Sequence, residues 1–222
     1  IFNKVKKKKE LVSTDRSTEK ISKSITRREV HPIPPKKRIY KLGSVFSDCI
    51  KCPELVVIPK GNFIFGASSL KSELDKHSLE VIIPQIFAIG RFEVTVSEWE
   101  ACAKEGGCSA YIPDSEEWNL PKNPVTNISW HDAIEYVQWL SMKTQNKYRL
   151  PSEAEWEYSA KAGSKSKFWW GDNIGINQAV CQECGSFYDG VRVAPVGTFS
   201  ANLFGLFDTA GNLWEWTQDC YK

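Results

Sequence analysis

Residues 204–216 read Phe-Gly-Leu-Phe-Asp-Thr-Ala-Gly-Asn-Leu-Trp-Glu-Trp, and they form the most specific pattern in the chain. Asp208 and Glu215 stand seven positions apart, and Gly211 between them allows the backbone to turn tightly. Such a turn can present two carboxylates and the intervening carbonyl oxygens to one cation. Hard oxygen ligands on an irregular loop favour Ca²⁺ over Zn²⁺ or Mg²⁺. The alternative is a turn whose acids are solvated and whose Trp side chains fill the core.

The composition around this stretch is that of a globular protein. The chain has 222 residues, of which 41% are hydrophobic and 12% aromatic, and this excludes a wholly disordered protein. No apolar run approaches the roughly 20 residues that a membrane-spanning helix requires. The first residue is Ile1 rather than Met, so we expect the sequence to be a fragment of a longer protein.

Charge divides the chain into two parts. Residues 1–42 carry 14 Lys and Arg against 4 Asp and Glu, whereas residues 43–222 carry 15 against 23. Self-repelling charge and the prolines of residues 32–35 predict a basic, disordered linker over residues 1–45. A folded domain is expected over residues 46–222. The run Lys6–Lys9 lacks interleaved aromatic residues for base stacking, so we expect a solvated tether and no nucleic-acid partner.

Short elements of both kinds precede the 204–216 stretch. Residues 55–59 and 62–66 are predicted as two strands of a hairpin joined by Lys60-Gly61, and residues 79–83 and 87–89 as further strands. Three helices are predicted, beginning after Thr95 or Ser97, after Ser129, and at the capping box Ser152–Glu155. Regular periodicity fades after Gly163. The sequence therefore predicts an irregular, loop-rich α+β domain.

Six of the seven cysteines fall into close pairs. The pairs are Cys49/Cys52, Cys102/Cys108 and Cys181/Cys184, and Cys220 stands alone. Local disulfides, a zinc site built from the two C-x-x-C pairs, and free thiols are the three alternatives. We favour disulfides because the two C-x-x-C pairs are far apart and neither flanks a compact ribbon turn. Disulfides would in turn favour an extracytoplasmic or secreted location.

Six ordered blocks between residues 53 and 219 resemble the formylglycine-generating enzyme, or sulfatase-modifying factor, family. They cover residues 55–66, 89–99, 124–133, 148–158 with 170–172, 194–202, and 204–216. On these blocks the chain is identified as a member of that family. It resembles the bacterial-like members. The resemblance implies a C-type-lectin-like, loop-rich α+β fold. It also implies a role in sulfatase maturation, in which a cysteine of a sulfatase-like substrate protein is oxidised to formylglycine.

The resemblance also implies structural Ca²⁺. One family site matches the side chains of Asp208 and Glu215 and the carbonyls of Gly211 and Leu213. A second site matches four residues of the loop before it, namely Val180, Cys181, Asp189 and Val191. The family usually has Asn where this chain has Val180, which leaves Asp189 as the sole side-chain ligand of the second site.

No catalytic residue is assigned. Catalytic members of the family continue past the Trp-Glu-Trp block with an Arg-Gly-Gly-Ser block and a cysteine pair that binds Cu⁺. This sequence ends at Lys222, and none of its seven cysteines matches that pair. We therefore expect the catalytic segment to be absent, with copper bound only if a missing C-terminal segment supplies the pair. The alternative function is a non-catalytic, lectin-like module that binds a protein, peptide or glycan and is joined to an upstream domain.

Overall fold

The computed structural model describes residues 40–66, 79–109 and 120–219. The predicted linker up to residue 39 and Cys220 lie outside the described residues. Residues 40–45, which the sequence analysis assigned to the linker, are already part of the folded chain. The backbone N–H of Gly43 donates to the carbonyl of Val57 at 2.9 Å, and β1 (Val45–Phe46) pairs with β2 (Leu55–Ile58).

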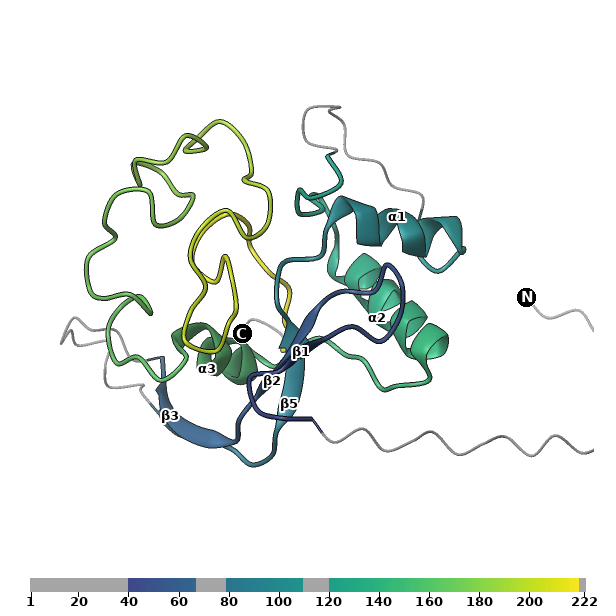
Figure 1. The fold of residues 1–222 in the computed structure, drawn as a ribbon, viewed down its shortest axis with the longest axis horizontal. Helices are drawn as coiled ribbons and strands as arrows, with labels where there is room; N and C mark the ends of the chain where they lie inside the picture. The colour runs from purple at the N-terminus through teal and green to yellow at the C-terminus, as the bar shows by residue number, and fades with distance from the viewer. Residues whose placement is uncertain (1–39, 67–78, 110–119, 220–222) are drawn as a thin grey trace, which may run out of the picture. The chain divides into compact units, whose positions relative to one another are not determined.

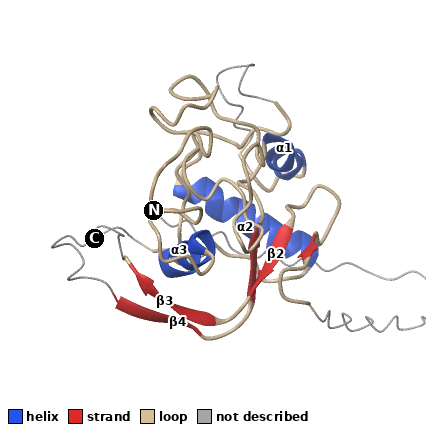
Figure 2. Ribbon diagram, turned by 60° about the vertical axis from the view of Figure 1, so that its left-hand side comes forward, coloured by secondary structure: helices blue, strands red, loops and turns tan. Residues whose placement is uncertain are grey.

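The strands form two small antiparallel sheets. The first has the order β1-β2-β5, with β5 at Phe87–Gly90, and Leu55 of β2 lies opposite Gly90. All four residues of β2 are buried, as expected for the central strand of a covered sheet. The second sheet pairs β3 (Gly61–Phe65) with β4 (Leu79–Ile83), and Figure 2 shows it as a separate two-stranded ribbon.

The predicted hairpin between residues 55–59 and 62–66 is wrong, although both strands exist. β2 and β3 belong to different sheets. Two-residue hairpins require a positive φ in the turn, and neither Lys60 nor Gly61 has one. Gly61 serves a different need, because a Cβ atom there would lie 2.4 Å from the hydroxyl oxygen of Tyr158.

The three predicted helices are present, and each begins with a capping box. They are α1 (Val96–Lys104), α2 (Trp130–Thr144) and α3 (Glu153–Lys161). Their N-caps are Thr95, Ser129 and Ser152, whose side chains each accept a hydrogen bond from the third helical residue. The third helix ends at Lys161 and is followed by Ala162 and Gly163, both of which have a positive φ.

Helices α1 and α2 enclose one core, and β2, β4 and α3 enclose another. The first contains Trp99, Tyr136, Trp139 and Leu140 with three cysteines, and the second contains Val56, Ile58, Ile83, Tyr158 and Leu206. The buried residues of α2 are Tyr136, Trp139 and Leu140. All three lie in the first core, which fixes the face of α2 that turns inward.

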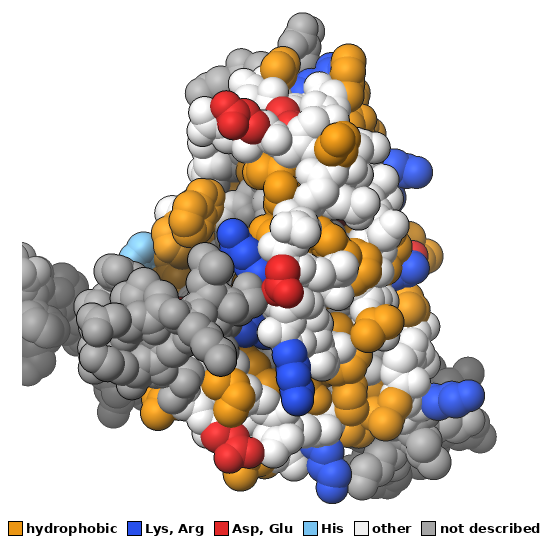
Figure 3. Space-filling model, turned by 90° about the vertical axis from the view of Figure 1, so that its left-hand side faces the viewer, with side chains coloured by type: hydrophobic (Ala, Val, Ile, Leu, Met, Phe, Trp, Pro, Cys, Tyr) orange, Lys and Arg blue, Asp and Glu red, His pale blue; other side chains and the backbone are white. Residues whose placement is uncertain are grey.

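The chain after α3 is built of turns and loops, seen as the green and yellow trace of Figure 1. Figure 3 shows the face formed on that side, where apolar side chains lie among scattered charged groups. The described part therefore has the mixed, loop-rich α+β architecture that the sequence predicts. None of its helices combines the length and the apolar character needed to cross a membrane.

Three local disulfides form as expected. They join Cys49 to Cys52, Cys102 to Cys108, and Cys181 to Cys184, with Cα–Cα distances of 5.1, 5.4 and 5.3 Å. These distances lie in the usual range for disulfides. The zinc alternative fails because the two C-x-x-C pairs are each closed on themselves. Cys102 and Cys108 are buried in the first core, where their disulfide ties the end of α1 to the segment that follows it.

Candidate functional site

The turn at residues 208–215 is shaped by three residues with positive φ. These are Asp208 at 54°, Gly211 at 88° and Asn212 at 62°. Glycine is required at position 211 for two reasons. Its φ is positive, and a Cβ atom there would lie 2.1 Å from the carbonyl oxygen of Val180. The sequence thus places glycine where the turn packs directly on another backbone segment.

Contacts of Asn212 and its neighbours leave two carbonyl groups free. The backbone N–H of Asn212 donates to the carbonyl of Val180 at 3.0 Å. Because the peptide unit is planar and trans, the carbonyl of Gly211 in the same unit points the opposite way. Within the described part of the chain, neither this carbonyl nor that of Leu213 accepts a hydrogen bond. Both are available as ligands.

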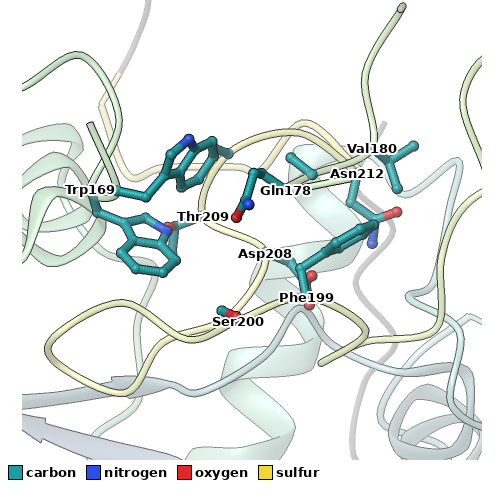
Figure 4. A pocket seen from close by; sticks show the side chains of 11 residues that line it. Trp169, Gln178, Val180, Phe199, Ser200, Asp208, Thr209 and Asn212 are labelled. Carbon is teal, nitrogen blue, oxygen red and sulfur yellow. The ribbon is translucent and has the colours of Figure 1, made fainter. Parts of the chain in front are cut away.

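Asp208 supplies a buried carboxylate with one free oxygen. The residue is only 8% exposed, and its Oδ2 accepts a hydrogen bond from the backbone N–H of Gly197 at 2.7 Å. Its Oδ1 is buried without a partner, as is the hydroxyl of neighbouring Thr209. Burial raises the pKa of Asp208, and the Gly197 hydrogen bond only partly offsets this. Figure 4 shows both residues in the wall of a hollow that Trp169 and Phe199 also line.

Two further carboxylates lie close enough to affect each other. Loss of hydration raises the pKa of the Glu215 carboxyl group to about 7, although a hydrogen bond from Trp156 opposes the shift, and the charge of Asp208 adds to it. The residue as a whole is nevertheless exposed. Burial, followed by the charges of Glu215 and Asp208, raises the pKa of Glu93 to about 9.

Glu93 is the site residue that the sequence analysis missed. It lies between β5 and α1, is 8% exposed, and accepts hydrogen bonds from Asn212 and Leu213 of the turn. A signal was present in the sequence, since Glu93 is a lone acid between Phe92 and Val94 in a stretch that enters the core. A buried acid normally has a specific partner.

The residues predicted as the first calcium site therefore lie in one turn, and their oxygen atoms are ligands that suit a hard cation. It offers an unpartnered buried carboxylate oxygen, a second carboxylate and two free carbonyls, which is the ligand chemistry of Ca²⁺. No group of three or more His, Cys, Asp or Glu side chains among the described residues is arranged to hold a metal. Any cation at this turn must therefore take backbone oxygens as well.

The alternative view of the same turn is wrong on two points. Its acid Asp208 is buried rather than solvated, and its two Trp side chains do not fill the core. Trp214 is fully exposed at 102%, and Trp216 is 50% exposed. The indole N–H of Trp216 donates to the carbonyl of Ile128 at 2.7 Å, which fixes that ring on the surface ahead of α2.

The second predicted set is engaged in contacts of its own. Both carboxylate oxygens of Asp189 accept hydrogen bonds, from the hydroxyl and backbone N–H of Ser186 and from the N–H of Cys181, and these lower its pKa. The carbonyl of Val180 is taken by Asn212, and Val191 is exposed. A second calcium site stays a prediction.

The described cysteines do not fit a copper site. A Cu⁺ site of the expected kind needs a pair of free thiolates, and all six cysteines in the described ranges are joined in disulfides. No reaction step is therefore assigned to copper with these residues.

Curated relatives match part of the chain. The bovine (Bos taurus) "Formylglycine-generating enzyme" is 38% identical over 117 residues, which cover 48% of this chain and 30% of that protein. The bovine "Inactive C-alpha-formylglycine-generating enzyme 2" is 36% identical over 108 residues, or 45% of this chain and 34% of that protein. The matched part of the chain thus spans about a third of the length of these relatives.

A solved structure and a family match extend over most of the chain. The structure of PvdO from Pseudomonas aeruginosa superposes with a TM-score of 0.71 at 33% identity, covering 83% of this chain and 77% of that chain. Residues 42–222 match the "Sulfatase-modifying factor enzyme 1-like domain". The described turn, helices and sheets all fall within that range. The chain therefore belongs to the sulfatase-modifying factor, or formylglycine-generating enzyme, family.

Proposed function

We propose that the chain provides the calcium-stabilised scaffold of a formylglycine-generating domain. Its substrate would be a sulfatase-like protein or peptide in which a cysteine side chain is oxidised to an aldehyde. The observation that carries the proposal is the family match over residues 42–222, supported by the similarity to formylglycine-generating enzymes. Three disulfides favour an oxidising, extracytoplasmic location for this work.

In this proposal the turn at residues 208–215 holds a structural Ca²⁺ ion. The side chains of Asp208 and Glu215 and the carbonyls of Gly211 and Leu213 are the ligands. The unpartnered Oδ1 of buried Asp208 supports this choice, because a cation would satisfy it. The ion would also offset the repulsion between the carboxylates gathered there.

A calcium titration of the full chain tests this part. Ca²⁺ is expected to raise the melting temperature of protein freed of metal with EDTA, and Asp208→Ala is expected to abolish the increase. Asp189→Ala, in the second predicted set, is the matched control and should retain it. A calcium response that survives Asp208→Ala but is lost with Asp189→Ala would assign the ion to the other loop.

A non-catalytic binding module is the second candidate function. Two observations favour it, namely the closed disulfides of all described cysteines and the fully exposed ring of Trp214. Trp214 directly precedes Glu215, so a cation at the turn would hold the backbone of this ring in place. A rigid exposed aromatic residue is a common anchor for a peptide or a glycan.

One assay separates the two functions. The full chain is incubated with a fluorescent peptide containing Cys-x-Pro-x-Arg, together with copper, O₂ and a thiol reductant. Peptide binding is read by polarisation, and aldehyde formation by mass spectrometry. Binding with aldehyde formation supports the enzyme, and binding without it supports the module. If polarisation is the same for a peptide with Ala in place of Cys, binding does not depend on the reacting side chain. No binding at all argues against a peptide substrate in either role.

A further inference from the structure

Glu93 joins the candidate cation turn to the part of the chain between β5 and α1. Its Oε2 accepts a hydrogen bond from the side-chain amide of Asn212 at 2.6 Å, and its Oε1 accepts one from the backbone N–H of Leu213 at 3.1 Å. These contacts span 119 and 120 residues of sequence. With 8% of its surface exposed, Glu93 is among the few charged residues buried in the described chain.

Asn212 extends the connection to two more segments. Its side-chain oxygen accepts a hydrogen bond from the backbone N–H of Ala194 at 2.9 Å, and its backbone N–H donates to Val180 at 3.0 Å. Hydrogen bonds to Glu93, Val180 and Ala194 thus hold Asn212 in its positive-φ conformation. Hydrogen-bonded networks of this kind restrict a loop to one conformation.

The anchored residues lie between the proposed ligands. Gly211 and Leu213 carry the two free carbonyls, and Asn212 stands between them in sequence. Because peptide units are planar, the bonded N–H of Asn212 fixes the plane that carries the Gly211 carbonyl, and the bonded N–H of Leu213 fixes the next plane, which carries the Asn212 carbonyl. The Leu213 carbonyl belongs to the peptide unit that follows, so Glu93 acts on it by holding the nitrogen of Leu213 in place. Without the carboxylate of Glu93, the N–H of Leu213 and the amide of Asn212 would lose their acceptor in a buried place.

Glu93 does not itself complete the ligand set. Each of its oxygens already accepts a hydrogen bond from the turn. Glu93, Asp208 and Glu215 also do not form a three-carboxylate metal group, because the described residues contain no such group. Its action on a cation must therefore pass through Asn212 and Leu213.

We propose that Glu93 is a positioning residue for the cation site, holding residues 212 and 213 so that the carbonyls of Gly211 and Leu213 converge with Asp208 and Glu215 on one divalent ion. This inference rests on the calcium site proposed above. Partners that orient metal ligands from outside the ligand set commonly contribute 10–100-fold to metal affinity. We expect an effect of about that size here.

The test measures ion binding directly and does not depend on catalysis. The full chain is titrated with Tb³⁺, whose luminescence is sensitised by nearby Trp side chains, and with Ca²⁺ in a calorimeter. Glu93→Gln preserves the shape of the side chain but places an amide N–H₂ against one of the two donors. It is expected to weaken binding of both ions about 10-fold or more while circular dichroism stays unchanged.

Glu98→Gln is the matched control. Glu98 is a partly buried acid on α1 and accepts a hydrogen bond from the backbone N–H of Thr95 at 2.8 Å. It does not contact the turn, so its substitution should leave ion affinity within about 2-fold even if the protein becomes less stable. Asn212→Ser, which removes the side-chain contacts with Glu93 and Ala194 but leaves the backbone contacts in place, is a second variant should Glu93→Gln fail to fold, and it too should weaken binding.

The outcomes distinguish failure of the positioning role of Glu93 from failure of the calcium site on which it rests. If the unmodified chain binds neither ion, the calcium site itself is wrong. If it binds but Glu93→Gln or Asn212→Ser binds equally well, the calcium site stands and the positioning role of Glu93 is overturned. A fall in melting temperature with unchanged affinity would also overturn it, because that is the signature of a purely structural contact.

Discussion

Gly211 shows how one residue sets the packing of the turn at residues 208–215. Its φ of 88° is in the region where glycine carries no penalty, and the carbonyl oxygen of Val180 occupies the space in which a side chain would begin. That same carbonyl accepts the hydrogen bond from Asn212. Backbone conformation, close approach and hydrogen bonding therefore all depend on the absence of a side chain here.

Replacing Gly211 by Ala is expected to lower the free energy of unfolding by about 2–4 kcal/mol, the sum of backbone strain and overpacking. The measurement is urea denaturation without added metal. Gly163→Ala is the control, because Gly163 has a similar φ of 84° but nothing within 4 Å of the added atom. It should cost only about 1 kcal/mol. Equal losses for the two variants would show that the contact with Val180 does not matter.

The residue scale also shows how far the sequence predicts the site. The spacing of Asp208, Gly211 and Glu215 in one short stretch predicts a turn that could present oxygens to a cation, whereas the carbonyls of Gly211 and Leu213 were assigned as ligands through the family resemblance. Glu93 was missed although it is a lone acid in an apolar stretch, because its contacts bridge about half the chain and no local pattern identifies its partners. The free Oδ1 of Asp208 could not be predicted either, since it follows from which groups surround that side chain in space.

At the scale of elements, α3 docks on β3 through Gly61 and Tyr158. A Cβ atom at Gly61 would lie 2.4 Å from the hydroxyl oxygen of Tyr158 and 3.2 Å from the ring carbon that bears it. Tyr158 is buried in the second core, where its ring also contacts Phe63 at a centroid distance of 5.5 Å. The glycine permits the ring to lie directly against the strand.

Gly61→Ala is therefore expected to destabilise the protein by about 1–3 kcal/mol. Tyr158→Phe, which removes the hydroxyl, should restore part of this loss when the two changes are combined. The coupling energy, measured by a double-mutant cycle in urea, should be about 1 kcal/mol in the direction of rescue. Strictly additive losses would mean that strand and helix adjust without the hydroxyl being the obstacle.

The sequence predicted the helices and strands more successfully than it predicted which strands pair. The starts of α2 and α3 were predicted, and that of α1 was narrowed to Thr95 or Ser97, because helix caps are local and involve residues only three positions apart. The pairing of β2 with β5 rather than β3 was not found. A glycine between two apolar runs looks the same whether it makes a turn or admits a side chain, and only the position of α3 decides between them.

At the scale of the whole molecule, the turn at residues 208–215 brings three carboxyl groups close enough to shift one another's pKa. Glu93, Asp208 and Glu215 come from two distant segments, and their charges act on one another. Without a cation, each ionisation adds a like charge to a poorly hydrated region. The folded state therefore favours keeping a proton on Glu93, whose pKa rises from 4.5 to about 9.

This raised pKa gives stability a definite dependence on pH. Between pH 4.5 and about 9 the folded state holds a proton on Glu93 that the unfolded state has released. The stabilisation is fully present below the unfolded pKa and is lost as pH rises through the folded one, so stability should fall with increasing pH. In EDTA, we expect the melting temperature to decrease steadily from pH 5.5 to 8.5. Glu93→Gln should flatten this decrease, whereas Glu100→Gln, an exposed change on α1, should not.

Calcium should act in the opposite direction and most strongly at high pH. A bound divalent ion offsets the charges of Asp208 and Glu215, so it lowers the cost of ionising Glu93 beside them. Binding also becomes tighter as the ligands lose their protons. The increase in melting temperature on adding Ca²⁺ should therefore be larger at pH 8.5 than at pH 5.5. An increase independent of pH would mean that the ion binds away from the three carboxylates, and the turn at residues 208–215 would then hold its buried acids without a cation.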